Sequence, residues 1–207
     1  VYVNGQEVGY WPYGYNSFYF DITKQLMPGK KNTLAVRLEN LPESSRWYPG
    51  AGLYRNVHVI VTENAHIPVW GTYVTTPTAT KEFAKVNVRT QIVLLEGADA
   101  GKYSVKTSVW NPNGQKLTEQ TIPLSQIKYN DNSLSQEFII QTPTLWSPDM
   151  PALYSAETRL YEGDQLKDIY TTPFGIRSIE IIPNKGFFLN GEKTVFKGVC
   201  NHHDLGP

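Results

Sequence analysis

The apolar residues of this chain recur with a period of two, and this alternation constrains the fold more than any other feature of the sequence. Across residues 86–94, every second residue is apolar or threonine, and most residues between them are polar. Residues 103–109 and 154–161 repeat the pattern. Successive side chains of a strand point to opposite faces of a sheet, so the alternation predicts strands with one buried face. No segment of similar length shows a helical period, and we therefore expect an all-β protein.

Three Asn-Gly pairs lie between apolar runs, at Asn4-Gly5, Asn113-Gly114 and Asn190-Gly191. Asn-Gly is the preferred pair for a two-residue hairpin loop because both residues tolerate a positive φ. The pairs therefore predict three hairpins. Most of the 14 prolines and 16 glycines fall between the expected strands, as turn residues of an all-β protein do.

Composition argues against several kinds of partner. The 19 lysines and arginines equal the 19 aspartates and glutamates, so net charge does not draw the chain to nucleic acid or to an anionic membrane. No run of about 18 apolar residues is present to span a bilayer. Cys200 has no second cysteine for a disulfide or a thiolate metal site. We expect no nucleic acid, no membrane, no metal and no other cofactor.

Two polar interruptions divide the chain. The strand expected at residues 57–61 ends in the sequence TENAHIP, which places a first boundary near Asn64. From there to Arg177, about seven short strands have the number and spacing typical of an immunoglobulin-like sandwich, although the Cys-Trp-Cys core of antibody domains is absent. A second boundary near Pro183-Asn184 precedes a hairpin-like lead that includes residues 194–199 and is too short to fold alone.

The final segment, VFKGVCNHHDLGP, joins an apolar strand to a cluster of polar side chains. The cluster consists of Asn201, His202, His203 and Asp204. Polar groups crowded at the end of a strand are typical of a binding site; the alternative is that they solvate a loop end. Two adjacent histidines do not easily face one ion, which argues against zinc.

A second candidate site is the loop SRWYPGAG at residues 45–52. Arg46 offers forked hydrogen bonds to sugar hydroxyls or to an acidic partner, and Trp47 adds a large ring beside it. The alternative is a packing corner between domains. The aromatic run that begins at Tyr10 would allow stacking on a sugar, but the alternation through Phe18 and Phe20 fits a buried strand face, so we favour packing.

Seven segments, taken in order, resemble glycoside hydrolase family 2, the group of β-galactosidases, β-glucuronidases and β-mannosidases. They extend over essentially all 207 residues, and the CNHHD ending and PGAG loop are most similar to bacterial β-galactosidases. The segments are VYVNGQEVG, YNSFYFDIT, NTLAVRLEN, SRWYPGAGLYRNVHV, LWSPDMPALY, FGIRSIEI and FFLNGEKTVFKGVCNHHDLG.

The resemblance implies three parts. Residues 1–63 would be the C-terminal part of a jelly-roll sugar-binding domain, residues 64–178 an immunoglobulin-like β-sandwich, and residues 179–207 the lead-in hairpin and first strand of a (β/α)8 barrel. It also implies hydrolysis of terminal β-glycosides with retention, which uses two carboxyl groups about 5 to 5.5 Å apart. In the family both are glutamates later in the barrel, so we expect no catalytic residue in this chain and no activity from it alone.

The resemblance further implies which residues contact the sugar. His202 would hydrogen-bond to it, with Asn201, His203 and Asp204 beside it, and Arg46 and Trp47 would come from the loop that leans toward the barrel mouth. We expect the parent enzyme to be a homo-oligomer and to act on a carbohydrate, and the chain, with uncovered strand edges, to self-associate. The compartment stays open among periplasmic, secreted and cytoplasmic, because the natural N-terminus is expected to be missing. A carbohydrate-binding module and an immunoglobulin-like scaffold, both without catalysis, remain alternatives.

Overall fold

The computed structural model describes residues 1–42, 51–94, 97–126 and 133–200 of the chain. Two compact units are present, Val1–Ile60 and Val61–Pro207. The described helices are three 3₁₀ turns of three residues each, at Thr23–Gln25, Ala100–Lys102 and Leu124–Gln126, so the all-β prediction is confirmed. None of these helices is long and apolar enough to cross a membrane.

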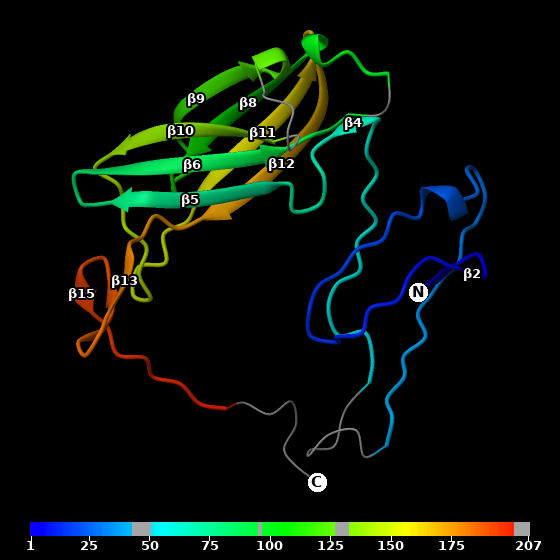
Figure 1. Ribbon diagram of the computed structural model, residues 1–207, viewed down its shortest axis with the longest axis horizontal. Helices are drawn as coiled ribbons and strands as arrows, with labels where there is room; N and C mark the ends of the chain where they lie inside the picture. Colours follow the sequence, from blue (N-terminus) through cyan, green and yellow to red (C-terminus); the bar gives the residue numbers. More distant parts are fainter. Residues whose placement is uncertain (43–50, 95–96, 127–132, 201–207) are drawn as a thin grey trace. The chain divides into compact units, whose positions relative to one another are not determined.

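The second unit is built on two antiparallel sheets packed face to face (Figure 1). One sheet has the strand order β10-β6-β5 and the other has the order β12-β11-β8-β9. These seven strands span β5 Thr72–Ala79, β6 Phe83–Gln91, β8 Tyr103–Trp110, β9 Lys116–Pro123, β10 Ser133–Gln141, β11 Tyr154–Glu162 and β12 Gln165–Phe174. Two short strands, β4 Ala65–His66 and β7 Val93–Leu94, pair with each other in a separate sheet; β4 precedes β5 in the sequence, and β7 follows β6. The strands predicted from the alternation at residues 103–109 and 154–161 are present, whereas the strand predicted at residues 86–94 is divided between β6, which ends at Gln91, and β7.

The facing sides of the two sheets form the core. Val86 and Val88 of β6 belong to one buried cluster with Val109 of β8 and Ala156 of β11. A second buried cluster includes Val105 and Leu160, from strands β8 and β11. Burial of these alternate residues is what the period of two predicts, because each strand turns one face to the opposite sheet.

Polar side chains are buried within this core and link the two sheets. The Thr107 hydroxyl on β8 donates to Gln136 Oε1 on β10 at 2.6 Å, and Gln136 Nε2 donates to the Gln120 carbonyl on β9 at 2.9 Å. The Thr158 hydroxyl lies 3.3 Å from that of Thr107. Gln136 is only 1% exposed, so its amide depends on these partners for hydrogen bonding.

Side chains of β12 close the neighbouring edge of the sandwich by binding to the segment that enters β5. Asp168 accepts from the Ile67 amide at 2.8 Å, and the Tyr170 hydroxyl accepts from the Trp70 amide at 3.1 Å. The hydroxyl of Thr172 bonds to that of Thr72. Because every second residue of β12 takes part, one face of this strand covers a sheet edge that would otherwise be open to pairing with another chain.

The three hairpins predicted from Asn-Gly pairs are confirmed, although one uses another turn. Asn4 and Asn190 have positive φ, at 52° each, followed by glycines that also have positive φ. Between β8 and β9, only Gly114 has positive φ, and the Asn111 amide donates to the Gln115 carbonyl at 2.9 Å around a three-residue loop. Pro112 begins that loop and fixes its own φ near −65°, which favours a type I turn followed by a left-handed glycine.

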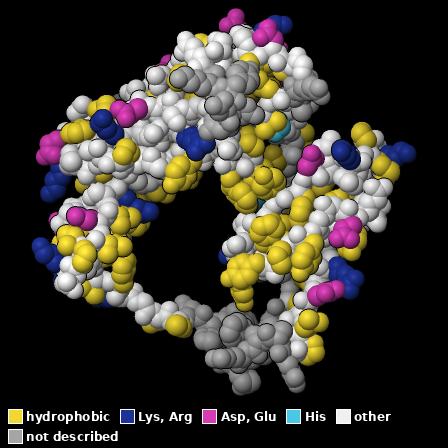
Figure 2. Space-filling model, viewed as in Figure 1, with side chains coloured by type: hydrophobic (Ala, Val, Ile, Leu, Met, Phe, Trp, Pro, Cys, Tyr) yellow, Lys and Arg dark blue, Asp and Glu magenta, His cyan; other side chains and the backbone are white. Residues whose placement is uncertain are grey.

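The first unit has little regular structure among its described residues. Its sheet has the order β2-β1-β3, with β1 Tyr2–Val3, β2 Gln6–Glu7 and β3 Leu34–Ala35. Val3 is its one buried residue in the described ranges, and Figure 2 shows apolar side chains across its surface. The strands predicted at residues 57–61 and through Phe18 and Phe20 are wrong. A strand needs a neighbour for its peptide groups, and no described segment pairs with either.

The aromatic run of this unit packs against itself. The Trp11 and Phe18 rings are stacked with centroids 5.8 Å apart, and the Phe18 and Phe20 centroids are 5.5 Å apart. Trp11 and Phe18 nevertheless remain exposed to solvent, so the predicted packing takes the form of ring contacts at the surface and not of a buried strand face.

We expect Gln136→Leu and Thr107→Val each to destabilise the sandwich by about 1 to 3 kcal/mol, because each leaves a buried polar partner unsatisfied. The double variant should lose less than the sum of the two, since it removes both ends of one hydrogen bond. Urea unfolding of the four proteins measures this coupling. Gln91→Leu, at an exposed position of β6, is the control and should change stability by less than about 0.5 kcal/mol. Strict additivity would contradict the assigned bond.

Candidate functional site

The six residues predicted to bind the substrate lie outside the described residues. Asn201, His202, His203 and Asp204 fall in the range 201–207, and Arg46 and Trp47 in the range 43–50. Their roles therefore stay predictions. What the structure does describe is the hairpin that leads into the terminal cluster and the contacts that fix this hairpin to the sandwich.

The leading hairpin is a three-stranded sheet with the order β13-β14-β15. Its strands are β13 Ile179–Ile182, β14 Gly186–Leu189 and β15 Glu192–Lys193. The strand predicted at residues 194–199 is wrong: Val195, Phe196 and Val199 are 72%, 75% and 85% exposed, and no described segment pairs with them. The Phe196 ring contacts Phe187 of β14 with centroids 4.6 Å apart, which keeps the start of this segment beside the hairpin.

Asn190 fixes the hairpin to two other segments. The side-chain Oδ1 of Asn190 accepts from the backbone amide of Ser178 at 3.0 Å, and the backbone amide of Asn190 donates to the Ser178 carbonyl at 3.0 Å. Its Nδ2 donates to the Trp146 carbonyl, also at 3.0 Å. Asparagine suits this place because it tolerates the positive φ of the turn and offers both a donor and an acceptor. We call these three bonds the Asn190 clamp.

Trp146 continues the connection into the sandwich core. Its amide donates to the carbonyl of the fully buried Ile176 at 2.8 Å, and the Arg177 guanidinium lies 4.6 Å from the centroid of its indole ring. A Cβ on Gly175 would lie 2.8 Å from Trp146 Cγ, so only glycine fits there. The sequence analysis treated Asn190 only as a turn residue, and it missed the role that Asn190 shares with Trp146 in fixing the hairpin to the sandwich.

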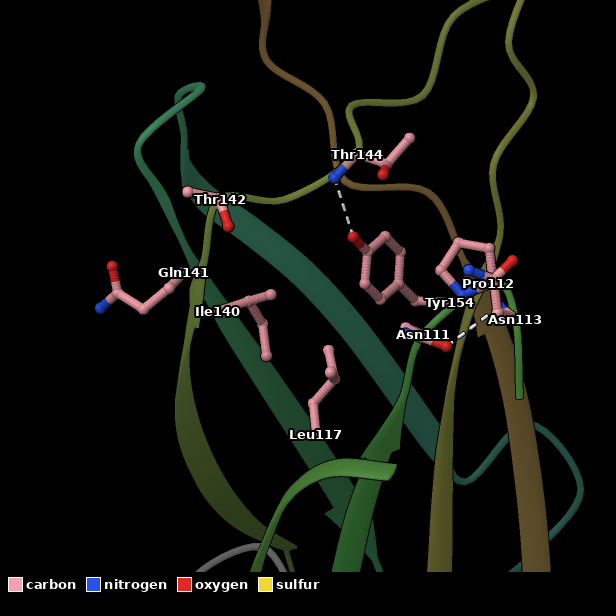
Figure 3. Close-up of a pocket in the computed structure, with 9 residues that line it drawn as sticks. All are labelled: Asn111, Pro112, Asn113, Leu117, Ile140, Gln141, Thr142, Thr144 and Tyr154. Carbon is pink, nitrogen blue, oxygen red and sulfur yellow. Dashed lines mark hydrogen bonds between the residues drawn. The ribbon is translucent and has the colours of Figure 1, made fainter. Parts of the chain in front are cut away.

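Two hollows lie on the sandwich unit. One, of about 350 Å³, is formed where the β8–β9 turn, the end of β10 and the start of β11 meet (Figure 3). The other, of about 310 Å³, is lined by charged groups. In it, the Lys167 ammonium lies 3.1 Å from a Glu162 oxygen and 3.2 Å from a Glu63 oxygen. Hydrogen bonds to Glu162 and then to Glu63 raise the pKa of Lys167. Burial, and next the charge of Glu162, raise the pKa of Tyr103 beside them.

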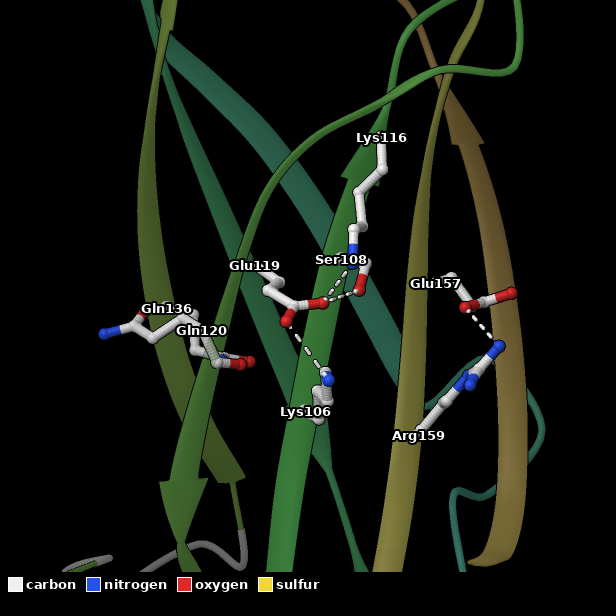
Figure 4. A network of polar contacts seen from close by, with 8 residues as sticks. All are labelled: Lys106, Ser108, Lys116, Glu119, Gln120, Gln136, Glu157 and Arg159. Carbon is white, nitrogen blue, oxygen red and sulfur yellow. Dashed lines mark hydrogen bonds and ion pairs between the residues drawn. The ribbon is translucent and has the colours of Figure 1, made fainter.

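The outer face of the β12-β11-β8-β9 sheet carries a second ionic network (Figure 4). The Glu119 carboxylate lies 2.8 Å from the Lys116 ammonium and 3.2 Å from that of Lys106. Hydrogen bonds from Lys116 and then from Lys106 lower the pKa of Glu119 from 4.5 to about 2. On the neighbouring strand, Glu157 pairs with Arg159 at 2.9 Å.

Glu119 is unsuited to be a proton donor, because a general acid needs a pKa near the working pH. Glu63, Glu157 and Glu162 are each held by a lysine or arginine, as structural carboxylates usually are. No three metal-binding side chains gather at one place within the part of the chain that the structure describes. These four glutamates are therefore ion-pair partners within the sandwich unit.

Residues 65–177, which span the sandwich, match the model of glycosyl hydrolases family 2. The whole chain is 38% identical to a β-galactosidase named BoGH2A from Bacteroides ovatus and covers 24% of that protein. It is 29% identical over 99% of its length to a β-glucuronidase from Bacteroides fragilis and covers 31% of it. A crystal structure of a family 2 member from Bacteroides cellulosilyticus overlaps 98% of this chain and 26% of its own, with a TM-score of 0.88 and 35% identity.

The fold defines the chain as an all-β protein built on a two-sheet sandwich, with a short hairpin fixed to it. With more than half of its length matched by the family model, the chain belongs to glycosyl hydrolases family 2. It spans 24% of the first curated relative and 19% of the second.

Removing the side chain of Asn190 should loosen the hairpin. Asn190→Gly keeps the positive φ without strain but loses two side-chain hydrogen bonds, so we expect a local cost of about 1 to 3 kcal/mol. Amide hydrogen exchange at Ser178 measures it. Asn184→Gly is the matched control, because Asn184 also has a positive φ, of 64°, in an exposed turn. Equal protection of Ser178 in both variants would show that the two side-chain bonds of the clamp contribute nothing.

The low pKa of Glu119 predicts how its contribution depends on pH. Since its pKa falls from 4.5 to about 2 on folding, its ion pairs stabilise the fold above pH 4.5, and this contribution is lost as the pH falls toward 2. Unfolding midpoints of the wild type and of Glu119→Gln should therefore differ at neutral pH and converge over that window. Glu137→Gln removes a more exposed pair with Lys85 and should show a smaller difference. A gap that persists at pH 2 would contradict the assignment.

Proposed function

We propose that this chain is the non-catalytic part of a retaining β-glycosidase, most like a β-galactosidase, that hydrolyses terminal β-glycosides. The observation that carries the proposal is the similarity of all 207 residues to a β-galactosidase at 38% identity. A β-glucuronidase and other β-galactosidases are also similar over nearly the whole chain, which supports a β-glycoside as the substrate class.

The proposed organisation has three parts. Residues 1–63 are the C-terminal part of a jelly-roll domain, residues 64–178 an immunoglobulin-like domain, and residues 179–207 the entry to a (β/α)8 barrel. Seven antiparallel strands divided three and four between facing sheets support the middle assignment. The Asn190 clamp supports a role for the middle domain as the base from which the barrel begins.

In this proposal the chain binds the sugar and leaves the bond-breaking to other residues. His202 hydrogen-bonds a sugar hydroxyl through its imidazole, and Asn201, His203 and Asp204 lie in the same pocket, with Arg46 and Trp47 at its mouth. Retention needs one carboxyl group that gives and takes a proton and another that attacks the anomeric carbon. The charge-paired glutamates of the described residues support placing both groups in the rest of a longer enzyme. We propose that this enzyme is a homo-oligomer.

The test uses the full-length protein that contains this chain and a panel of nitrophenyl β-D-glycosides. We expect turnover of the galactoside, and a loss of about 100-fold in kcat/KM for His202→Ala, or about 2.7 kcal/mol, because a sugar contact that strengthens in the transition state is removed. His58→Ala, at an exposed position, should leave kcat/KM unchanged. The 207-residue chain alone should give no turnover above the blank.

Each other outcome has a defined meaning. Turnover of the glucuronide alone would keep the reaction class and change the sugar. Turnover by the isolated chain would overturn the non-catalytic assignment. Binding to glycans without hydrolysis of any substrate would favour a carbohydrate-binding module, and neither binding nor hydrolysis would favour a scaffold.

A further inference from the structure

The three Asn-Gly pairs of the chain differ in how their asparagine side chains are held. Asn4 Oδ1 accepts from the Thr33 amide at 2.9 Å. Asn4 Nδ2 donates to Asn32 Oδ1 at 2.7 Å and to the Gln25 carbonyl at 2.8 Å. The Asn190 side chain is bonded through both its oxygen and its nitrogen in the Asn190 clamp. In both pairs the carboxamide is therefore fixed in one orientation.

The third pair, Asn113-Gly114, lies in the exposed loop between β8 and β9. The Asn113 side chain has no hydrogen-bond partner among the residues that the structure describes. Its backbone amide donates to Asn111 Oδ1 at 3.0 Å (Figure 3), and the Gly114 amide donates to the Asn111 carbonyl at 3.0 Å. The main chain of this loop is thus held by hydrogen bonds, whereas the Asn113 carboxamide is free to rotate.

A carboxamide that is free to rotate can react with the peptide group that follows it. The backbone nitrogen of Gly114, after losing its proton to hydroxide, attacks Cγ of Asn113. The new N–Cγ bond closes a cyclic imide, the Cγ–Nδ2 bond breaks, and the side-chain nitrogen takes a proton from water and leaves as ammonia. Water then opens the imide at either carbonyl, which gives aspartate or isoaspartate. Glycine favours ring closure because it has no Cβ to hinder the approach to its nitrogen.

We propose that Asn113 is a site of spontaneous deamidation in the folded protein and that Asn4 and Asn190 are protected from it. At each protected residue, bonds to both the oxygen and the nitrogen of the carboxamide must break before Cγ turns toward the glycine nitrogen. At Asn113, the main-chain bond from Gly114 to Asn111 must open, but no side-chain bond has to break. The inference rests on these contacts and does not depend on the proposed glycosidase function.

The modification changes both the charge and the length of the loop. Either product places a carboxylate close to Lys116, whose ammonium already pairs with Glu119. The isoaspartate product also adds a carbon atom to the main chain, in a loop that is closed by two bonds of 2.9 Å between Asn111 and Gln115. We therefore expect the Gln115 amide to exchange faster with solvent in the isoaspartate form than in the unmodified chain.

The test is incubation of the folded 207-residue chain at mildly alkaline pH, followed by peptide mass spectrometry at successive times. Replacement of the amide group by a carboxyl raises the mass of the peptide, and chromatography separates aspartate from isoaspartate. We expect deamidation at Asn113 to be at least about tenfold faster than at Asn4 or Asn190, because the side-chain bonds of these two lower the population of the reactive form. Equal rates at the three sites, or a faster reaction at Asn4 or Asn190, would overturn the proposal.

Two controls assign the difference to the folded structure. In the urea-unfolded chain, each asparagine is followed by glycine without fixed contacts, so the three rates should converge. A difference that persists in urea would attribute the order to the neighbouring sequence and contradict protection by the hydrogen bonds. Asn113→Gln requires a six-membered ring, which closes far more slowly, and should abolish the mass change at this position while the rates at Asn4 and Asn190 stay the same.

Discussion

The buried hydrogen bond from Thr107 to Gln136 is the constraint on which the rest of the sandwich depends. Apolar burial draws the two sheets together but has no direction, so it does not by itself fix how one sheet lies on the other. A bond between buried polar groups does, because another alignment of the sheets would break the bond between Thr107 and Gln136 and leave the Gln136 oxygen buried without its donor.

The sequence predicted the strands in which alternate side chains are buried against the opposite sheet. Residues 86–94, 103–109 and 154–161 alternate because one face of each strand meets the opposite sheet, and all three form strands. Residues 57–61 and 194–199 show similar apolar character but form none. The alternation within a segment shows which face of a strand would be apolar. Whether the segment forms a strand depends on a neighbouring strand that supplies hydrogen bonds to its backbone. The sequence of a single segment carries no information about that neighbour.

The candidate site was predictable only in part, for the same reason. The resemblance to a family led to His202 and its neighbours, which lie outside the described residues, and no local pattern marked the contacts that fix the preceding hairpin to the sandwich. Asn190 was visible as a turn residue, but its bonds reach 12 residues back to Ser178 and 44 back to Trp146. One signal was present: Asn4 in the sequence VNGQEV uses the same pair of bonds with Thr33 that Asn190 in LNGEKT uses with Ser178.

The Asn190 clamp also sets an order of assembly. Both partners of its side chain precede it in the chain, and one of them, the Trp146 carbonyl, is in place only when Ile176 is seated in the sandwich core. During synthesis from the N-terminus, the sandwich strands therefore close first, and the hairpin docks on a finished surface. A ribosome-bound chain that stops before residue 190 lacks the clamp altogether. The chain after the hairpin is therefore synthesised when the sandwich to which the hairpin binds has already folded.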